Sequence, residues 1–161
     1  MVFSNLIYSK TRVENVAVDN LWNQGYRVFF PQIIFEKLNI KKENVKIEPL
    51  FPRYLFIKIN ILKDNLTSIK STRGVSHLVA FGNNFAQVQA QLVESIQSQC
   101  DENGILYHKL RNIEYKKGDK TLIKSGLLKN QKAIFLSKDS NKRVKVLLYL
   151  TNLTAIAELP S

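Results

Sequence analysis

The sequence predicts an α+β sandwich over residues 1–100, a linker over residues 101–115 and a small second domain over residues 116–161. Apolar residues alternate as in a strand most clearly over Arg53–Ile59, and helical spacing recurs on both sides of that stretch. The linker segment shows no sustained period. A chain of 161 residues is long enough to form two small cores.

The first elements are a short strand and a helix. Leu6–Tyr8 predicts the strand. Thr11 and Glu14 have the spacing of a capping box, in which each side chain satisfies a free backbone amide, so we expect a helix from about Arg12. Gly25 is a suitable C-terminal stop. The apolar positions of this helix form one stripe, which consists of Val13, Val16, Ala17 and Leu21.

A second strand and a hairpin or loop are expected next. Tyr26–Phe30 is strand-like and is ended by Pro31. The charged stretch Glu36–Glu48 is typical of an exposed hairpin tip or loop before Pro49. This part of the chain should therefore lie at the surface of the sandwich.

The strand Arg53–Ile59 carries apolar side chains on both faces. Because side chains alternate across a strand, Tyr54 and Phe56 face one way, and the opposite face consists of Leu55, Ile57 and Ile59. One face must be the domain core. The aromatic face then needs another cover, either a second element of this chain or a partner protein.

The remainder of the first domain is predicted as a turn, a strand and a helix. A polar connector containing Asp64 leads to the turn Ser71–Gly74, and Val75–Phe81 is strand-like before the turn Gly82–Asn84. The sandwich should end near Cys100 with a helix whose apolar positions are Phe85, Val88, Leu92 and Ile96.

From Lys116 onward the periodicity fits two structures. Val144–Leu150 alternates as a strand would, with Thr121–Lys124 and Lys132–Leu136 as earlier strands of a small barrel. The region fits helices equally well, because residues at helical spacing also share faces. These sets are Ile123, Leu127 and Ile134, and Leu147, Leu150, Leu153 and Ala157. Periodicity does not choose between the barrel and the helices.

The composition indicates a nucleic-acid or ribonucleoprotein partner and a cytoplasmic protein. The net charge of +11 is spread over both halves and favours association with polyanions. The single cysteine, Cys100, excludes an internal disulfide and a CxxC motif, which suits a reducing compartment. No apolar run approaches the ~20 residues that a membrane helix needs, so we expect no membrane association.

The sequence offers no recognisable catalytic set. His77, His108 and Cys100 are scattered, and most acidic residues are interleaved with lysines, whereas catalysis or metal binding needs convergent groups. We therefore expect no enzyme activity, no catalytic residue, no metal and no cofactor.

Two long motifs resemble the NusG family. The first is EPLFPRYLF at Glu48–Phe56, and the second is STRGVSHLV at Ser71–Val79, followed by Phe81 and Gly82. Within the family, the pattern is most similar to the antiterminator branch called RfaH. The agreement extends over nearly the whole chain, to Tyr8, Lys10, Gly118–Lys120 at the start of a KOW-type module, and Ala133–Phe135.

The resemblance implies a NusG N-terminal-like domain that binds RNA polymerase. The positions that line the hydrophobic depression for the polymerase clamp helices are Tyr8, Tyr54 and Phe56. A contact with the polymerase gate loop would involve Asn65, Leu66 and Thr67, of which only the threonine matches in kind. The surface that reads the exposed non-template DNA strand would consist of Lys10, Asn20, Thr72 and Arg73. A structural turn is the alternative for Thr72 and Arg73.

The resemblance also implies a KOW-type C-terminal domain that changes its fold. RfaH-like second domains form an α-helical hairpin that masks the clamp site, and they refold as a β-barrel once released. The loop Ser125–Asn130 departs from the KOW pattern, which weakens the barrel signal. An interdomain latch would consist of Glu48, Arg143, Ile123 and Phe135. The alternative is a second domain that is always a barrel, as in general NusG.

The function implied is that of a monomeric transcription elongation factor and antiterminator. It would bind RNA polymerase at paused complexes, contact the non-template strand and suppress pausing and termination. The released domain would bind the small ribosomal subunit and couple translation. Two alternatives remain, a general NusG-like elongation factor without sequence-specific recruitment and a non-specific RNA- or ribosome-binding module.

Overall fold

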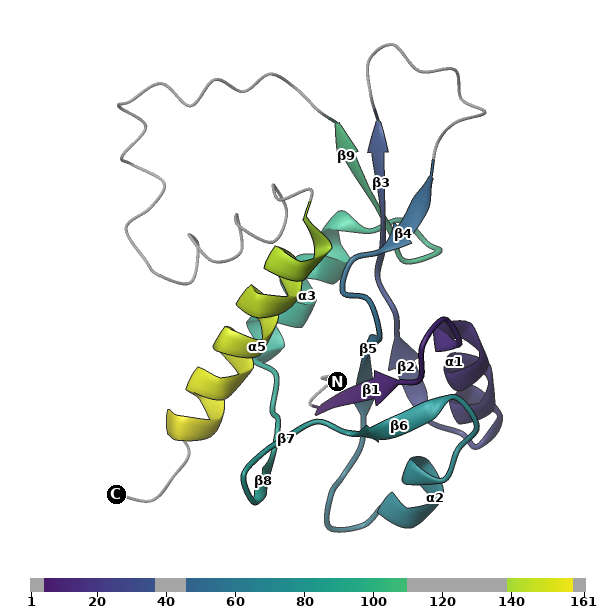
Figure 1. Cartoon of the computed structure of the whole chain (residues 1–161), viewed down its shortest axis with the longest axis vertical. Coiled ribbons are helices and arrows are strands. Elements are labelled where there is room, and N and C mark those ends of the chain that lie inside the picture. Colours follow the sequence, from purple (N-terminus) through teal and green to yellow (C-terminus); the bar gives the residue numbers. More distant parts are fainter. Residues whose placement is uncertain (1–4, 37–45, 110–138, 158–161) are drawn as a thin grey trace.

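The structure is a computed structural model of the 161-residue chain, and it describes residues 5–36, 46–109 and 139–157. Its centre is a four-stranded sheet in the order β2-β5-β1-β6, in which all neighbouring strands are antiparallel (Figure 1). The strands are β1 (Asn5–Ser9), β2 (Arg27–Phe29), β5 (Tyr54–Lys58) and β6 (Val75–Leu78).

Helices pack against both faces of this sheet. On one side lie α1 (Glu14–Asn23) and α2 (Leu66–Lys70). On the other side lie α3 (Ala90–Gln99) and α5 (Ser140–Ala157), as Figure 1 shows. The predicted α+β sandwich is therefore confirmed for the first domain. A helix from the second half of the chain forms part of one outer layer.

The predicted alternation of β5 is also confirmed. Leu55 and Ile57 belong to a core cluster with residues of α1 and α2, namely Ala17, Leu21 and Ile69. Phe56 belongs to the second cluster, which contains α3 residues and also Leu147 and Leu150 of α5. The additional cover that the aromatic face requires is thus supplied by this chain.

A three-stranded sheet in the order β4-β3-β9 extends from the first. Strands β3 (Gln32–Glu36) and β4 (Ile47–Pro49) pair antiparallel on either side of the undescribed residues 37–45, as expected for the predicted hairpin. Strand β9 (Ile105–Lys109) pairs parallel with β3. It lies within the predicted linker 101–115, so these five residues belong to a sheet rather than to a free connection.

Three local predictions were wrong. The capping box does not form, because α1 begins at Glu14 with Val13 as its N-cap, which makes no side-chain hydrogen bond, and Arg12 has a φ of +60°. Phe85 and Val88 both precede α3, and Phe85 lies in β8 (Asn84–Phe85), which pairs with β7 (Ala80–Phe81) around the predicted turn. The short helix α2 lies where only a connector was expected.

Ser140–Ala157 is helical in this structure. Residues Val144–Leu150, which fit a strand and a helix equally well, lie within α5. The strand alternative is therefore not adopted here. The predicted barrel strands at 121–124 and 132–136 lie outside the described residues, as do the KOW-type motif and the side chains of Leu153 and Ala157. Of the helices that the structure describes, none is long and apolar enough to cross a membrane.

Candidate functional site

Two aromatic side chains of the predicted clamp-binding set stack on adjacent strands. Tyr8 on β1 pairs with Tyr54 on β5, and their ring centroids are 5.0 Å apart. Strand β6 pairs with β1 on the other side, and the imidazole of its residue His77 lies 5.1 Å from the Tyr8 ring. Phe56, two residues along β5, is fully buried. Because Tyr8, Tyr54 and Phe56 share one side of the sheet, we call them the aromatic face.

Arg53 fixes the geometry of the aromatic face. Its φ of +73° is in the left-handed region, which is costly for a residue with a side chain. Its carbonyl accepts from Ser9 N at 2.7 Å and its Nε donates to Ser9 O at 3.0 Å. Its guanidinium also lies 4.1 Å from the centre of the Tyr8 ring, in a cation–π contact. Arg53 was not among the predicted site residues, although it stands inside the first motif.

The environment of the aromatic face is partly desolvated. Burial raises the pKa of the Tyr54 phenol, Tyr8 raises it further, and the positive charge of Arg53 lowers it. Both tyrosines are half-buried, and they pack against the same hydrophobic cluster as α5. Aromatic side chains with a polar edge in such a setting are typical of binding surfaces that release water on contact with a protein.

Helix α5 packs onto this cluster through a broad apolar face. Leu147 is fully buried and Leu150 is 8% exposed, while Tyr149 on another side of the helix is 55% exposed. Val144, Val146 and Leu148 pack against the same cluster. Helix α5 therefore shares a hydrophobic cluster with the aromatic face.

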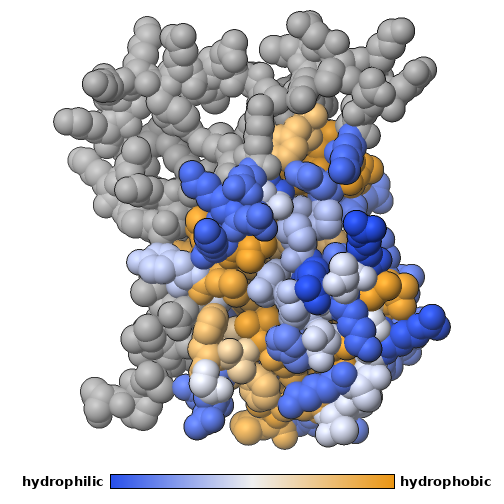
Figure 2. Space-filling model, in the orientation of Figure 1, coloured by the Kyte–Doolittle hydropathy of each residue, from blue (hydrophilic) through white to orange (hydrophobic). Residues whose placement is uncertain are grey.

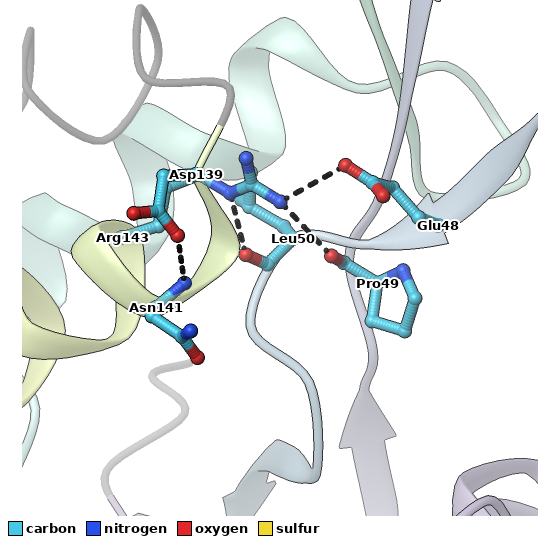
Figure 3. Close-up of polar contacts among 6 residues, drawn as sticks. All are labelled: Glu48, Pro49, Leu50, Asp139, Asn141 and Arg143. Atoms are coloured by element: carbon cyan, nitrogen blue, oxygen red, sulfur yellow. Dashed lines mark hydrogen bonds and ion pairs between the residues drawn. The ribbon is translucent and has the colours of Figure 1, made fainter.

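Arg143 joins α5 to the end of β4 and to Leu50, which follows that strand (Figure 3). Its side chain is fully buried. Nε donates to Leu50 O at 2.8 Å, and Nη2 donates to Pro49 O and to Glu48 Oε1, each at 3.3 Å. The predicted pairing of Glu48 with Arg143 is therefore present in the structure. Ile123 and Phe135, the other predicted latch residues, lie outside the described residues.

The electrostatics of Arg143 are those of a buried, paired cation. Burial lowers its pKa, whereas the charge of Glu48 and the hydrogen bond to it raise that pKa. An arginine remains charged in proteins, so its burial depends on acceptors that replace water. The carboxylate and the two carbonyl oxygens are such acceptors, and they tie the start of α5 to the first motif.

The predicted DNA-binding residues gather around the turn between α2 and β6. Lys10 N donates to Gly74 O at 2.8 Å, and Asn20 Nδ2 lies 3.4 Å from Arg73 O. Lys10 and Arg73 are exposed and Asn20 is half-exposed. The structure thus brings these three side chains to one surface, which we call the turn surface. Figure 2 shows hydrophilic residues, in blue, over the part of the molecule where α1 and α2 lie.

Thr72 differs from the other three predicted DNA-binding residues. It is only 6% exposed, and its hydroxyl donates to Ser68 O at 2.8 Å and accepts from Gln24 Nε2 at 2.7 Å. Gln24 Oε1 in turn accepts from the Ser68 hydroxyl at 2.8 Å. This network gives Thr72 the structural role that was its alternative. It also identifies Gln24, which no motif in the sequence had indicated.

The predicted gate-loop residues lie at the start of α2. The Asn65 side chain accepts from Ser68 N at 3.1 Å and so caps the helix. Leu66 is half-buried and packs against the cluster under α1 and α2. Thr67, the residue shared in kind with the RfaH pattern, is exposed. Asn65 and Leu66 therefore have roles in the fold, and Thr67 is available at the surface.

Metal binding and thiol chemistry have little support among the described residues. Within residues 5–36, 46–109 and 139–157, no three His, Cys, Asp or Glu residues are grouped so as to hold a metal ion. Burial and the neighbouring Asp101 raise the pKa of the Cys100 thiol to about 11, so it is a poor nucleophile at neutral pH. What the described residues present is two contact surfaces, the aromatic face and the turn surface.

The residues that form these surfaces lie within a segment that matches one known protein family. The model described as "Transcription termination factor nusG" matches residues 6–97 of this chain. The match covers more than half of the chain and includes the aromatic face, the turn surface and Glu48.

Proposed function

Since the chain belongs to the NusG family of transcription factors, whose members bind RNA polymerase, we propose that it is an antiterminator of the RfaH type whose polymerase site is masked by its own C-terminal region. In this proposal the aromatic face holds the clamp helices of the polymerase. The bound factor then disfavours the paused state and suppresses termination. No bond of a substrate is made or broken.

The observation that carries the proposal is the position of α5. Its buried residues Leu147 and Leu150 belong to the same cluster as Phe56, and Arg143 ties it to Glu48. A factor with a constitutively open polymerase site would leave Tyr8 and Tyr54 free of such a cover. An apolar helix that shields a protein-binding face supports control by release of that helix.

The turn surface supports recruitment by DNA. Lys10 can neutralise a phosphate, and the exposed Arg73 can bond base edges or stack on an unpaired base. Asn20 adds the acceptor Oδ1, because its Nδ2 already donates to Val16 O at 2.9 Å and lies 3.4 Å from Arg73 O. We propose that these three side chains engage the non-template strand of a paused complex, and that Thr67 contributes to a contact with the gate loop.

Release of α5 completes the proposed cycle. Once the C-terminal region leaves the aromatic face, residues 116–161 refold as a KOW-type barrel and bind the small ribosomal subunit. The double periodicity of this region supports the refolding, because the same residues satisfy a helical and a strand pattern. The factor acts as a monomer in the cytoplasm.

Transcription in vitro tests the function directly. The purified factor is added to RNA polymerase on a template with a pause site and a terminator, and the fraction of full-length RNA is measured. We expect the factor to increase it and Tyr54→Ala to remove most of that increase, with Tyr149→Ala as a matched control because Tyr149 is exposed on α5. No change in pausing or termination on any of a set of templates with different pause sequences would reject the proposal.

The pause sequence of the template distinguishes the proposed antiterminator from a general elongation factor. A factor of the RfaH type should act only where a particular non-template sequence is exposed. A general elongation factor of the NusG type should act equally on all templates. Equal action on a set of shuffled pause sequences would therefore favour the general elongation factor. Binding to RNA polymerase would remain part of that function.

A further inference from the structure

An open groove lies beside the turn surface and is absent from the predicted sites. It is lined by the end of α1, the start of β2, the end of β5 with the segment after it, and Gln97 of α3, and its volume is about 1070 Å³. Its notable residue is Trp22, which is 47% exposed although large aromatic side chains are usually covered. We propose that this groove binds an unpaired nucleotide of single-stranded DNA, with the base stacked on Trp22.

The lining of the groove suits a nucleotide. Trp22 offers an indole face, on which any base can stack, and Arg27 and Lys58 bring positive charge that can pair with phosphate. The Arg27 guanidinium lies 5.7 Å from the Trp22 ring centre, so the two side chains support each other. The acidic lining residue, Asp64, is engaged by the backbone, since its Oδ2 accepts from Asn60 N at 2.6 Å.

The groove is continuous with the turn surface through Gln24. Gln24 lines the groove, and its Nε2 donates to the Thr72 hydroxyl at 2.7 Å, next to Arg73. A strand held at Lys10 and Arg73 therefore needs to pass only the end of α1 to reach Trp22. The volume lies slightly above the roughly 300–1000 Å³ of small-ligand sites, which leaves room for a nucleotide. This inference rests on the proposed function, because the strand is the one that a transcribing polymerase exposes.

The fluorescence of the chain reports on the groove specifically, because Trp22 is the only tryptophan. The full chain is titrated with a single-stranded 12-mer of deoxythymidine and, in parallel, with the 12-mer of uridine. Stacking predicts a saturable change in Trp22 emission with the DNA oligomer. No emission change with DNA, or a change with RNA alone, would overturn the proposal.

Variants measure how much the groove contributes to binding. With a dye-labelled DNA oligomer and anisotropy as the readout, we expect Trp22→Ala to raise Kd about 5- to 150-fold and Trp22→Phe to raise it less, because a phenyl ring still stacks. Circular dichroism checks that both variants fold. Wild-type affinity in a folded Trp22→Ala variant would overturn the proposal.

A charge-matched pair tests the phosphate contact. Arg27→Gln should reduce the slope of log Kd against log salt by about 0.7, the value for one phosphate contact with a single strand. Lys142→Gln removes the same charge from an exposed position on α5 and should leave the slope unchanged. An equal effect of the two variants would mean that only net charge matters, and it would contradict the groove.

The groove proposal and the proposed function can be rejected independently of each other. Binding to RNA polymerase without DNA is measured for Arg143→Ala, in which α5 should be released, and for the same variant with Trp22→Ala added. If neither binds polymerase while DNA still changes Trp22 emission, the proposed function is rejected and the groove stands. If both bind polymerase and DNA leaves the emission unchanged, the groove is rejected alone.

Discussion

Glu48 accepts a hydrogen bond from Arg143 over 3.3 Å, although 95 positions separate the two residues in the chain. The partners differ in exposure, because the Arg143 side chain is fully buried and the Glu48 side chain is 32% exposed. The carbonyls of Pro49 and Leu50 supply the other acceptors. The contact therefore joins α5 to the motif that also carries Tyr54 and Phe56.

Loss of the arginine should weaken the docking of α5. Arg143→Ala leaves the buried carbonyl of Leu50, the partly buried carbonyl of Pro49 and a carboxylate without this donor, which should cost about 2–4 kcal/mol in the free energy of unfolding. Glu48→Gln keeps both carbonyl contacts and should cost less. Hydrogen exchange of the α5 amides in the full chain measures the difference. Protection of α5 that is equal in Arg143→Ala and the wild type would show that the apolar contacts alone hold the helix.

Two glycines with the same backbone conformation should differ in what they tolerate. Gly74 has a φ of +93°, and a Cβ there would lie 2.7 Å from Ala17 N, whereas Gly25 has a φ of +92° and nothing within 4 Å. Gly25→Ala should lower the free energy of unfolding by about 1 kcal/mol, because alanine is strained at a positive φ. Gly74→Ala should cost about 1–3 kcal/mol more, because the turn must move away from α1. Urea unfolding gives both values, and equal values would contradict the contact.

The roles of Thr72 and Arg73 should separate. Thr72→Val removes a hydroxyl that bonds Ser68 and Gln24, so we expect a loss of about 1–3 kcal/mol in the free energy of unfolding, with Thr72→Ser close to the wild type. Arg73→Ala should leave that free energy within about 0.5 kcal/mol and weaken binding to single-stranded DNA. A stable Thr72→Val variant that loses DNA binding would instead place Thr72 in the contact.

The Cys100 thiol should be unreactive until high pH. Its pKa is raised from 9.0 to about 11 by burial, so at pH 8 its thiolate fraction, and with it the rate of alkylation by iodoacetamide, should be about 100-fold below that of an ordinary thiol. The unfolded chain ionises first as the pH rises. Stability should therefore fall between about pH 9 and pH 11, and Cys100→Ala should reduce that fall. Rapid alkylation of the folded chain at pH 8 would contradict this burial.

The sequence predicts the central sheet better than the connections around it. The alternation over Tyr54–Lys58 correctly separates the two faces, because both carry large apolar residues and the period is set by the pleat. The predicted start of α1 was wrong. Thr11 and Glu14 have the spacing of a capping box, but the φ of Arg12 prevents the box from forming. Spacing does not reveal backbone conformation.

Contacts between distant segments explain the other differences. Strand β9 resembles a linker in sequence, and its partner β3 lies more than 70 positions earlier, so only the fold reveals the pairing. Gln24 likewise carries no local signal, because its role depends on Thr72 and Ser68. The Glu48–Arg143 pair was predictable only because the motifs resemble a family, since charge pattern alone offers many partners for each residue.

The central claim is that α5 excludes RNA polymerase from the aromatic face. It is tested most directly by the Kd for RNA polymerase of the full chain and of its Arg143→Ala variant, without DNA, with Lys145→Ala as a control on the exposed side of α5. The account predicts that Arg143→Ala binds at least tenfold more tightly than the wild type and that Lys145→Ala binds like the wild type. Equal binding of wild type and Arg143→Ala, with α5 shown by hydrogen exchange to be released in the variant, would contradict the account.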